Sequence, residues 1–462
     1  MIIVRTNKRP AATVAAASTL GVMALGVLAL SGCDLKVVQP DIASAASVNA
    51  PAARVTLLNG AVSLLTAGYA GNGDNSGLAS LGGLLTDEFL NSDYQDRHID
   101  VDKRNVPENS TAVQTMYANL QRARVAGEDV AARYAASEPN SVHGAEAELV
   151  AAYSYLVFAE SFCNGVPYST LSASGSPVYG TPETSAQSYT RALTHFANAI
   201  TIASRAGAAN SDVADVLNAA RVGRGRTLLG QGQYAAAAAA VAAVTTPSFH
   251  YDLFASSGSS TQNNGVFAWN NNYGRFTAAD RESGEGLNFL SANDPRTPYQ
   301  DAGRFGLDAR TPLVFQEKYP DYASSTVLAS YTEAELIRAE ADLQAGSANW
   351  LTRLNTLRAG VGLSALVDPS LGSAQGPTKA RVALLFRERA FWLWLSGHRS
   401  GDLRRQLRQY ASFFPSQAEI YPTGVYVKGG NYGTDVVFKV PFDERNNPNY
   451  AKLATTCTDF NP

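Results

Sequence analysis

The chain has 462 residues, a formal net charge of −3, 45% hydrophobic residues and 17% charged residues. This length exceeds what one small core organises, so we expect either two domains or one helical framework that carries large insertions. The weak net charge supplies no strong field for nucleic acid or an anionic membrane, and no nucleic-acid partner is expected.

Residues 1–32 have the features of an export signal. A positively charged start is followed by a stretch of small and apolar residues from 11 to 30. Leu30-Ser31-Gly32-Cys33 then resembles a lipobox, in which small residues fit a signal peptidase and the Cys33 thiol accepts diacylglycerol. A transmembrane anchor is the alternative, because about 20 apolar residues can span a bilayer. We expect lipidation at Cys33, and two or three acyl chains hold a protein firmly on a membrane.

The segment 33–55 is small, polar and proline-containing, which predicts an extended tether ahead of a body that covers 56–462. A helix is expected over 54–67. Glycine, asparagine and serine dominate residues 68–83, and this composition predicts a flexible loop.

Only three cysteines occur, at positions 33, 163 and 457. If Cys33 carries lipid, an even pair remains in an oxidising compartment. We predict a disulfide between Cys163 and Cys457, and two free buried thiols are the alternative.

Paired helices are the main pattern in the rest of the chain. Apolar residues recur at helical spacing in 144–162 and 186–205. In the next pair, Gly232, Tyr234 and Ala237 form the turn signature of a tetratricopeptide repeat, where glycine permits a tight reversal and alanine a close approach. Two looser pairs cover 332–358 and 378–410. Helical repeats are therefore predicted over 144–245 and 332–410, with an irregular helical bundle as the alternative.

Residues 246–330 are rich in glycine, serine, asparagine, proline and aromatic residues, with weak periodicity. A connection this long without structure is uncommon, so we expect an ordered insertion with short strands that packs on the repeats. The predicted fold class is mainly α, with tetratricopeptide-like helix pairs as a scaffold for this loop-rich insertion.

Several patterns of catalysis are absent from the sequence. It has no phosphate-binding loop, no Gly-x-Ser-x-Gly elbow and no His-Glu-x-x-His pair. The dispersed cysteines and histidines do not suit zinc, and neither a metal nor another cofactor is expected. Carboxylates cluster at Asp87-Glu88 and at 280–285, and a glycosidase would need two suitably separated acids. We interpret both clusters as solvated loop acids, so no enzyme is predicted.

Motifs across the chain resemble the SusD/RagB family of nutrient-binding outer-membrane lipoproteins. The resemblance covers the post-lipobox opening Cys33 to Pro40, the helix end Phe162-Cys-Asn-Gly-Val-Pro167, and Tyr331 to Ala341 with Leu354 to Leu363. Its most specific part is Arg387-Glu388-Arg389 followed by Gly397-His398-Arg399 and Asp402-Leu-Arg404-Arg405. The stretch from Phe438 to Asn449 resembles the closing segment.

This resemblance implies a protein on the outer membrane that captures an oligomeric nutrient, a glycan before a peptide. The ligand would pass to a TonB-dependent transporter of the SusC type, with no bond broken. Family ligand sites lie in the early non-repeat region and the mid-chain insertion. The residues expected to bind ligand are therefore Tyr94, His98, Trp269, Asn270, Asn271, Tyr273 and Phe276.

The most specific motif is interpreted as architecture. Arg399 and Asp402 stand three apart on a helix and can pair. Glu388, Arg389 and Arg404 are expected to complete an ionic network between repeats, and Trp350, Trp392 and Trp394 to lie in the core. Two other functions stay open: a lipid-anchored repeat scaffold that recruits envelope proteins, and a surface glycosidase.

Overall fold

The computed structural model describes residue 48 and residues 50–450, except 173, 208–211, 371, 373 and 374. The predicted signal sequence, Cys33, most of the tether and Cys457 lie outside the described residues. None of the described helices combines the length and the apolar character that crossing a bilayer requires.

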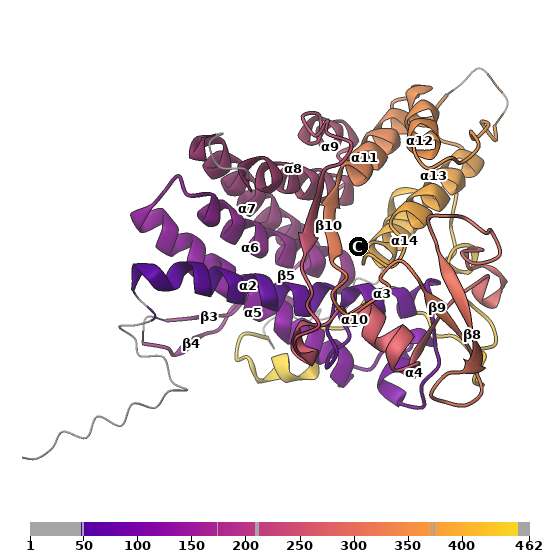
Figure 1. Ribbon diagram of the computed structural model, residues 1–462, viewed down its shortest axis with the longest axis horizontal. Helices are drawn as coiled ribbons and strands as arrows, with labels where there is room; N and C mark the ends of the chain where they lie inside the picture. The colour runs from indigo at the N-terminus through magenta and orange to yellow at the C-terminus, as the bar shows by residue number, and fades with distance from the viewer. Residues whose placement is uncertain are drawn as a thin grey trace, which may run out of the picture. The chain divides into compact units, whose positions relative to one another are not determined.

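The first helices pack side by side (Figure 1): α2 (Arg54–Tyr69), α5 (Thr111–Ser137) and α6 (Val142–Ser161). The sequence predicted α2 closely. Residues 68–83 form a loop only in their first part, because α3 (Leu78–Leu85) begins inside the segment and all its residues are buried. The prediction of a flexible loop is wrong there, since the apolar residues from Leu78 onward enter the core.

Helix pairs follow as predicted: α7 (Ser185–Ala206), α8 (Asp212–Gly230) and α9 (Tyr234–Ala240). A capping box starts α7, because Thr184 Oγ1 accepts from the backbone N–H of Gln187 at 3.2 Å. The turn between α8 and α9 contains Gly232 with φ +72°, a left-handed conformation that glycine adopts without strain. The repeat signature thus marks the reversal that it predicts.

The second run of helices comprises α11 (Tyr331–Gln344), α12 (Asn349–Ala359), α13 (Lys379–Trp392) and α14 (Arg399–Gln409). Ser330 caps α11 and Thr378 caps α13 through their side-chain oxygens. Both α8 and α9 pack against α11, so the two runs form one scaffold. The predicted fold class, mainly α with tetratricopeptide-like pairs, is confirmed.

The strands are short and form antiparallel two-stranded ladders. Within 246–330, β6 (His250–Leu253) pairs with β10 (Thr326–Ser330), and β8 (Tyr299–Phe305) pairs with β9 (Pro312–Gln316). The remaining ladders are β2 (Val166–Pro167) with β5 (Pro182–Glu183) and β3 (Thr170–Leu171) with β4 (Pro177–Val178). The predicted insertion with short strands is therefore present.

One ladder joins the insertion to the early part of the chain. β1 (Phe89–Asn91) pairs with β7 (Phe276–Ala278), and α4 (Asp96–Asp102) follows β1. A short helix α10 (Gly265–Phe267) and a π-helical turn η3 (Ala268–Asn272) precede β7. We call β1, α4 and residues 246–330 the insertion lobe. Figure 1 shows α4, β8 and β9 close together within it.

Short 3-10 turns complete the secondary structure: η1 (Pro51–Ala53), η2 (Ser260–Gln262), η4 (Glu282–Gly284), η5 (Gln417–Glu419) and η6 (Phe442–Asn446).

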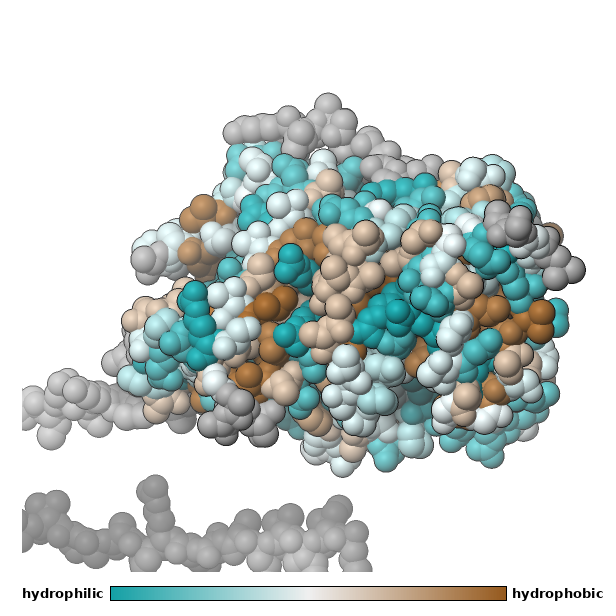
Figure 2. Space-filling model, turned by 90° about the horizontal axis from the view of Figure 1, so that it is seen from above, coloured by the Kyte–Doolittle hydropathy of each residue, from teal (hydrophilic) through white to brown (hydrophobic). Residues whose placement is uncertain are grey.

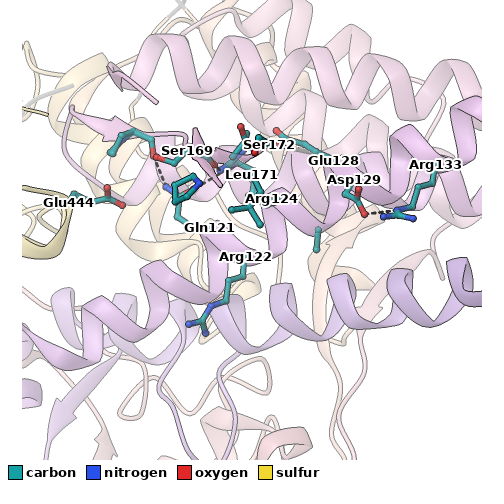
Figure 3. A pocket seen from close by; sticks show the side chains of 15 residues that line it. Gln121, Arg122, Arg124, Glu128, Asp129, Arg133, Ser169, Leu171, Ser172 and Glu444 are labelled. Carbon is teal, nitrogen blue, oxygen red and sulfur yellow. Dashed lines mark hydrogen bonds and ion pairs between the residues drawn. The ribbon is translucent and has the colours of Figure 1, made fainter. Parts of the chain in front are cut away.

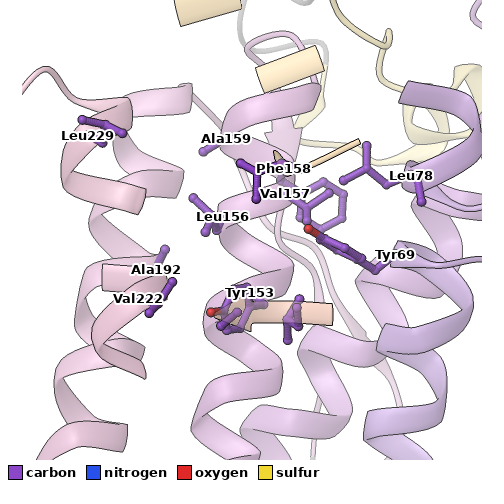
Figure 4. Close-up of a cluster of buried hydrophobic side chains, with 14 of the residues drawn as sticks. Tyr69, Leu78, Tyr153, Leu156, Val157, Phe158, Ala159, Ala192, Val222 and Leu229 are labelled. Carbon is purple, nitrogen blue, oxygen red and sulfur yellow. The ribbon is translucent and has the colours of Figure 1, made fainter. Parts of the chain in front are cut away.

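Buried hydrophobic side chains form one large cluster that includes both the helical repeats and the insertion lobe. Figure 4 shows part of it, where Tyr69 lies on one side of α6 and Leu156 of α6 points to the other side, toward Ala192 and Val222. Trp350 and Trp394 are fully buried, as predicted, whereas Trp392 is half-buried. The surface mixes characters: on the face in Figure 2, hydrophobic residues alternate with hydrophilic ones rather than forming one continuous patch.

Candidate functional site

Lys428 ties three separate segments of the chain together at the insertion lobe. Its ammonium group donates to Asn91 Oδ1 at 2.6 Å and to the carbonyl of Asp93 at 2.7 Å. It also lies 2.7 Å from Asp308 Oδ2. The segments around residues 93, 308 and 428 are therefore neighbours although they are distant in sequence.

Asp93 is the second anchor of this site. Its Oδ1 accepts from the backbone N–H of Tyr94 at 2.7 Å, and its Oδ2 accepts from Arg275 at 2.6 Å. Burial alone would raise the pKa of Asp93, but hydrogen bonds from His98 and Arg275 outweigh it and lower the pKa to about 2. Burial lowers the pKa of His98. Asp93 is thus an ionised carboxylate that orders the chain before α4.

The residues beside these anchors face the surface. Tyr94 is 65% exposed, Leu307 39% and Val427 63%, and each lies one position from Asp93, Asp308 or Lys428. Phe305, at the end of β8, is 55% exposed. Exposed hydrophobic side chains gathered on rigid segments are typical of binding surfaces. We call Tyr94, Phe305, Leu307 and Val427 the platform.

The aromatic residues that the sequence predicted as ligand contacts come together below this surface. His98 lies 5.1 Å from Trp269 and 5.0 Å from Phe276, ring centroid to ring centroid, and Trp269 stacks on Phe276 at 5.7 Å. Trp269 donates its indole N–H to the carbonyl of Asn72 at 2.9 Å. All three rings are buried, at 0–4% exposure. Direct stacking of a ligand on these rings does not fit their burial, because their faces already contact one another.

The two predicted asparagines hold the lobe together. Asn270 is buried and donates to the carbonyls of Phe276 and Val314 at 2.8 and 2.9 Å. Asn271 and Gln316 exchange hydrogen bonds between η3 and β9. Their amide groups are thus used within the protein, which does not fit a role as free ligand contacts. Of the predicted set, Tyr94 is exposed and Tyr273, packed edge-on against Trp269, is partly so.

The two distant segments that the sequence proposed do meet in the structure, and the exposed residues Phe305, Leu307 and Val427 were not among those predicted. The sequence contains one local signal for the hairpin that joins β8 and β9. Asp308 Oδ1 accepts from the backbone N–H groups of Arg310 and Thr311, which is an Asx turn that a hairpin loop favours. Such a turn predicts that the residues just before it reach the surface.

The motif interpreted as architecture is an ionic network in the core, although its pairs differ from the prediction. Arg399 pairs with Asp87 through two hydrogen bonds of 2.7 and 2.8 Å, rather than with Asp402. Asp402 accepts from Arg389 twice at 2.9 Å and from Arg405 at 3.0 Å. The predicted Arg399–Asp402 pair is wrong because Asp87, far away in sequence, reaches Arg399 from the segment after α3.

The other members of the motif join helices as expected. Glu388 is buried and pairs with Arg296 of the insertion lobe and with Arg358 of α12. Arg404 donates to the carbonyls of Ala159, Glu160 and Phe162 at 2.9–3.0 Å. Carbonyls at the C-terminal end of a helix have no N–H partner within it, so the guanidinium both caps α6 and fixes α14 beside it.

A cleft of about 920 Å³ lies between α5 and the β3–β4 hairpin (Figure 3). Its charged side chains are largely paired with one another. Arg133 donates to Asp129 at 2.7 Å, and Arg124 donates to Glu128 at 2.9 Å. None of the described residues that line the cleft is aromatic. It therefore offers less for stacking than the platform does.

Two acids in the insertion lobe have the raised pKa values that general acids need. Burial raises the pKa of Asp102 to about 7 and that of Glu282 well above its ordinary value. Tyr426 donates to Asp102 at 2.7 Å and Tyr432 to Glu282 at 2.7 Å. Asp102 is fully buried beneath these tyrosines, so a substrate has no access to it. Within the described residues, no three metal-ligating side chains come together.

Comparison with known proteins gives structural matches but no sequence matches. No family profile and no curated protein matches the chain. A SusD superfamily protein from Parabacteroides distasonis is similar with a TM-score of 0.64 and 13% identity, over 86% of this chain and 98% of that one. Surface glycan-binding protein A from Bacteroides uniformis gives 0.61 and 14%, over 86% and 98%. A SusD/RagB family protein from Bacteroides thetaiotaomicron gives 0.56 and 16%, over 76% and 87%.

These matches cover 76–86% of this chain, and at 13–16% identity they show the fold. The family resemblance of the motifs around Arg389, Arg399 and Arg404 points the same way. The chain therefore has the SusD/RagB fold, with a sequence far diverged from those of the solved structures.

Proposed function

We propose that this chain captures an oligosaccharide on the platform and releases it intact to a TonB-dependent transporter. The observation that carries the proposal is the platform itself, in which exposed hydrophobic residues stand beside the ionic anchors Asp93, Asp308 and Lys428. Sugar rings present apolar C–H faces to aromatic side chains, and their hydroxyl groups need donors and acceptors at the rim. The exposed side chains of Arg304 and Asp301 lie on β8 near Phe305 and supply such groups.

Two further observations support this role. A protein of similar fold is named a surface glycan-binding protein. The lipobox ending at Cys33 would anchor the chain, and we propose the outer membrane as its location, facing the cell surface. The buried acids offer no accessible catalytic pair, which favours binding without hydrolysis.

The test is binding of a panel of oligosaccharides to the purified lipoprotein in detergent, by isothermal titration calorimetry. We expect Tyr94→Ala and Phe305→Ala each to weaken binding about tenfold, because a lost stacking contact is worth roughly 1 kcal/mol or slightly more. Phe254→Ala is the matched control, since Phe254 is 77% exposed outside the platform. Unchanged affinity in both platform variants, or product formation from the glycans, would contradict the proposal. Co-purification of a large transporter would support the delivery step.

A further inference from the structure

A second cavity, of about 420 Å³, lies where the β6–β10 ladder meets the start of α11 and the end of α13. None of the platform residues lines it. Its walls include Asp252, Lys318, Glu333, Trp392 and His398. A cavity of this size falls within the range of protein sites for small molecules.

Glu333 is the first sign that the cavity is a binding site. Its carboxylate is 1% exposed, and Oε1 makes no hydrogen bond within the described residues although His398 Nε2 is 3.3 Å away. Arg226 lies 2.8 Å from that same Nε2 and can only donate, so Nε2 is the acceptor. The imidazole proton then resides on Nδ1, 3.0 Å from the carbonyl of Ser396. The imidazole N–H is thus directed at Ser396 rather than at Glu333.

Two other buried polar atoms of the cavity walls also lack a hydrogen-bond partner among the described residues. The indole N–H of Trp392 has no acceptor within the described part of the chain, and Asp252 Oδ1 has no hydrogen-bond donor there. Asp252 Oδ1 is 3.2 Å from His250 Nδ1 without forming a hydrogen bond. Buried polar groups are satisfied in the great majority of cases, so several unsatisfied ones around one cavity are available to a ligand.

The charges of the walls indicate what this ligand carries. Two carboxylates, Asp252 and Glu333, and one ammonium group, that of Lys318, line the cavity. Lys318 donates to the carbonyl of Trp394 and forms no ion pair with either acid among the described residues. The cavity thus offers two acceptor oxygens for a cation and one indole N–H for an oxygen.

We propose that this cavity binds a small molecule with a protonated amine, which donates to Glu333 and Asp252 while a ligand oxygen accepts from Trp392 Nε1. A free amino acid and an amino sugar both have this chemistry. The site is separate from the platform and does not rest on the glycan-binding proposal.

The experiment is calorimetric titration of the full lipoprotein with two sets of probes, the free L-amino acids and D-glucosamine. Neutral counterparts, N-acetyl amino-acid amides and D-glucose, are titrated in parallel. We expect one charged probe to bind and its neutral counterpart to bind at least tenfold more weakly. Trp392→Phe retains a ring but removes the N–H, so it should weaken binding several-fold, up to about tenfold. Whether an amino acid or glucosamine binds identifies the source of the amine.

Two controls separate this site from the others. Trp350→Phe changes a buried tryptophan of α12 outside the cavity, and Tyr94→Ala changes the platform; both should leave amine binding unchanged. Trp392→Phe in turn should leave oligosaccharide binding unchanged. The proposal is overturned if no charged probe binds, if the neutral probes bind equally well, or if Trp392→Phe binds like the wild type.

Discussion

Buried charges in this protein are held in pairs, and the pair Arg399–Asp87 shows what each member contributes. Arg399 is 6% exposed and Asp87 fully buried. Transfer of both charges from water is costly, and their attraction offsets that cost only while both are present. The backbone N–H of Leu287 also donates to Asp87 at 2.9 Å, which links the pair to the insertion lobe.

Arg399→Ala should lower the free energy of unfolding by about 3–5 kcal/mol, because it leaves Asp87 charged and buried without its partner. Urea denaturation followed by circular dichroism measures this change. Arg224→Ala, at an exposed position of α8, is the control and should change stability little. Loss of ligand affinity with unchanged stability would show that Arg399 belongs to a binding site instead.

Glu88 gives the protein a specific dependence of stability on pH. Burial raises the pKa of Glu88 to about 8, and among the described residues only its Oε1 has a partner, the backbone N–H of Leu395 at 2.8 Å. In an unfolded chain, a glutamate side chain has a pKa of about 4.3. Between about pH 4 and about pH 8 the native state therefore holds one proton more than the unfolded state. The contribution of Glu88 to the free energy of unfolding therefore falls as pH rises through this window.

Glu88→Gln removes this titration while keeping the shape of the side chain. We expect the urea midpoint of the variant to fall less than that of the wild type between about pH 5 and about pH 8. From the lower to the upper end of this range, the variant should therefore lose less stability than the wild type does. Parallel pH profiles of the two proteins would show that Glu88 is ionised in the native state.

At the scale of elements, close packing of α7 and α8 depends on a missing side chain. A Cβ at Gly223 would lie 2.3 Å from the ring of Phe196 and 2.9 Å from that of Tyr153. Both rings are buried, so neither can swing into solvent. The repeat pair thus requires glycine at this position for contact rather than for backbone conformation.

Gly223→Ala should destabilise the protein by about 1–3 kcal/mol, the usual cost of overfilling a packed interface. Gly60→Ala is the matched control within α2, where a Cβ would meet nothing within 4 Å. That change should stabilise the helix by up to about 1 kcal/mol, because alanine loses less conformational entropy. Thermal melting of both variants measures the difference, and equal shifts in the two would contradict the packing argument.

The helices also show how far a sequence alone predicts this fold. Positions such as Leu149 and Leu156, or Leu354 and Leu357, recur with the helical turn, and these segments are helices. The long helix α5 went unpredicted although Val113, Met116 and Leu120 carry the same spacing, so its signal was present. Periodicity predicts each helix because it records which face is buried.

Contacts between residues far apart in the sequence leave no such periodic signal. Arg399 and Asp87 are 312 positions apart, and each could pair with nearer charges. In the candidate site, Tyr94 is exposed whereas His98 and Trp269 are buried. This difference depends on contacts such as those of Lys428 with Asp93 and Asp308, which join distant segments. The sequence could therefore name segments that meet, but not which of their side chains are exposed.

At the scale of the whole molecule, covalent bonds are expected at both ends of the chain. Cys163, just after α6, is disulfide-bonded. The predicted partner, Cys457, lies outside the described residues, and the pairing stays a prediction. We expect non-reducing peptide mapping to give one fragment that joins the peptides of Cys163 and Cys457, and Cys33→Ala to release the protein from membranes. Detection of free Cys457 would contradict the first expectation, and membrane retention of the Cys33 variant the second.

In each of the three segments that meet at Lys428, an anchoring residue stands next to an exposed one, and the two have different roles. Asp93, Asp308 and Lys428 fix the loops from within, while Tyr94, Leu307 and Val427 meet the solvent. Substitutions at the outward positions can accordingly accumulate without loosening the loops. Under the proposed function, a designed library at these positions would redirect recognition while the scaffold remains intact.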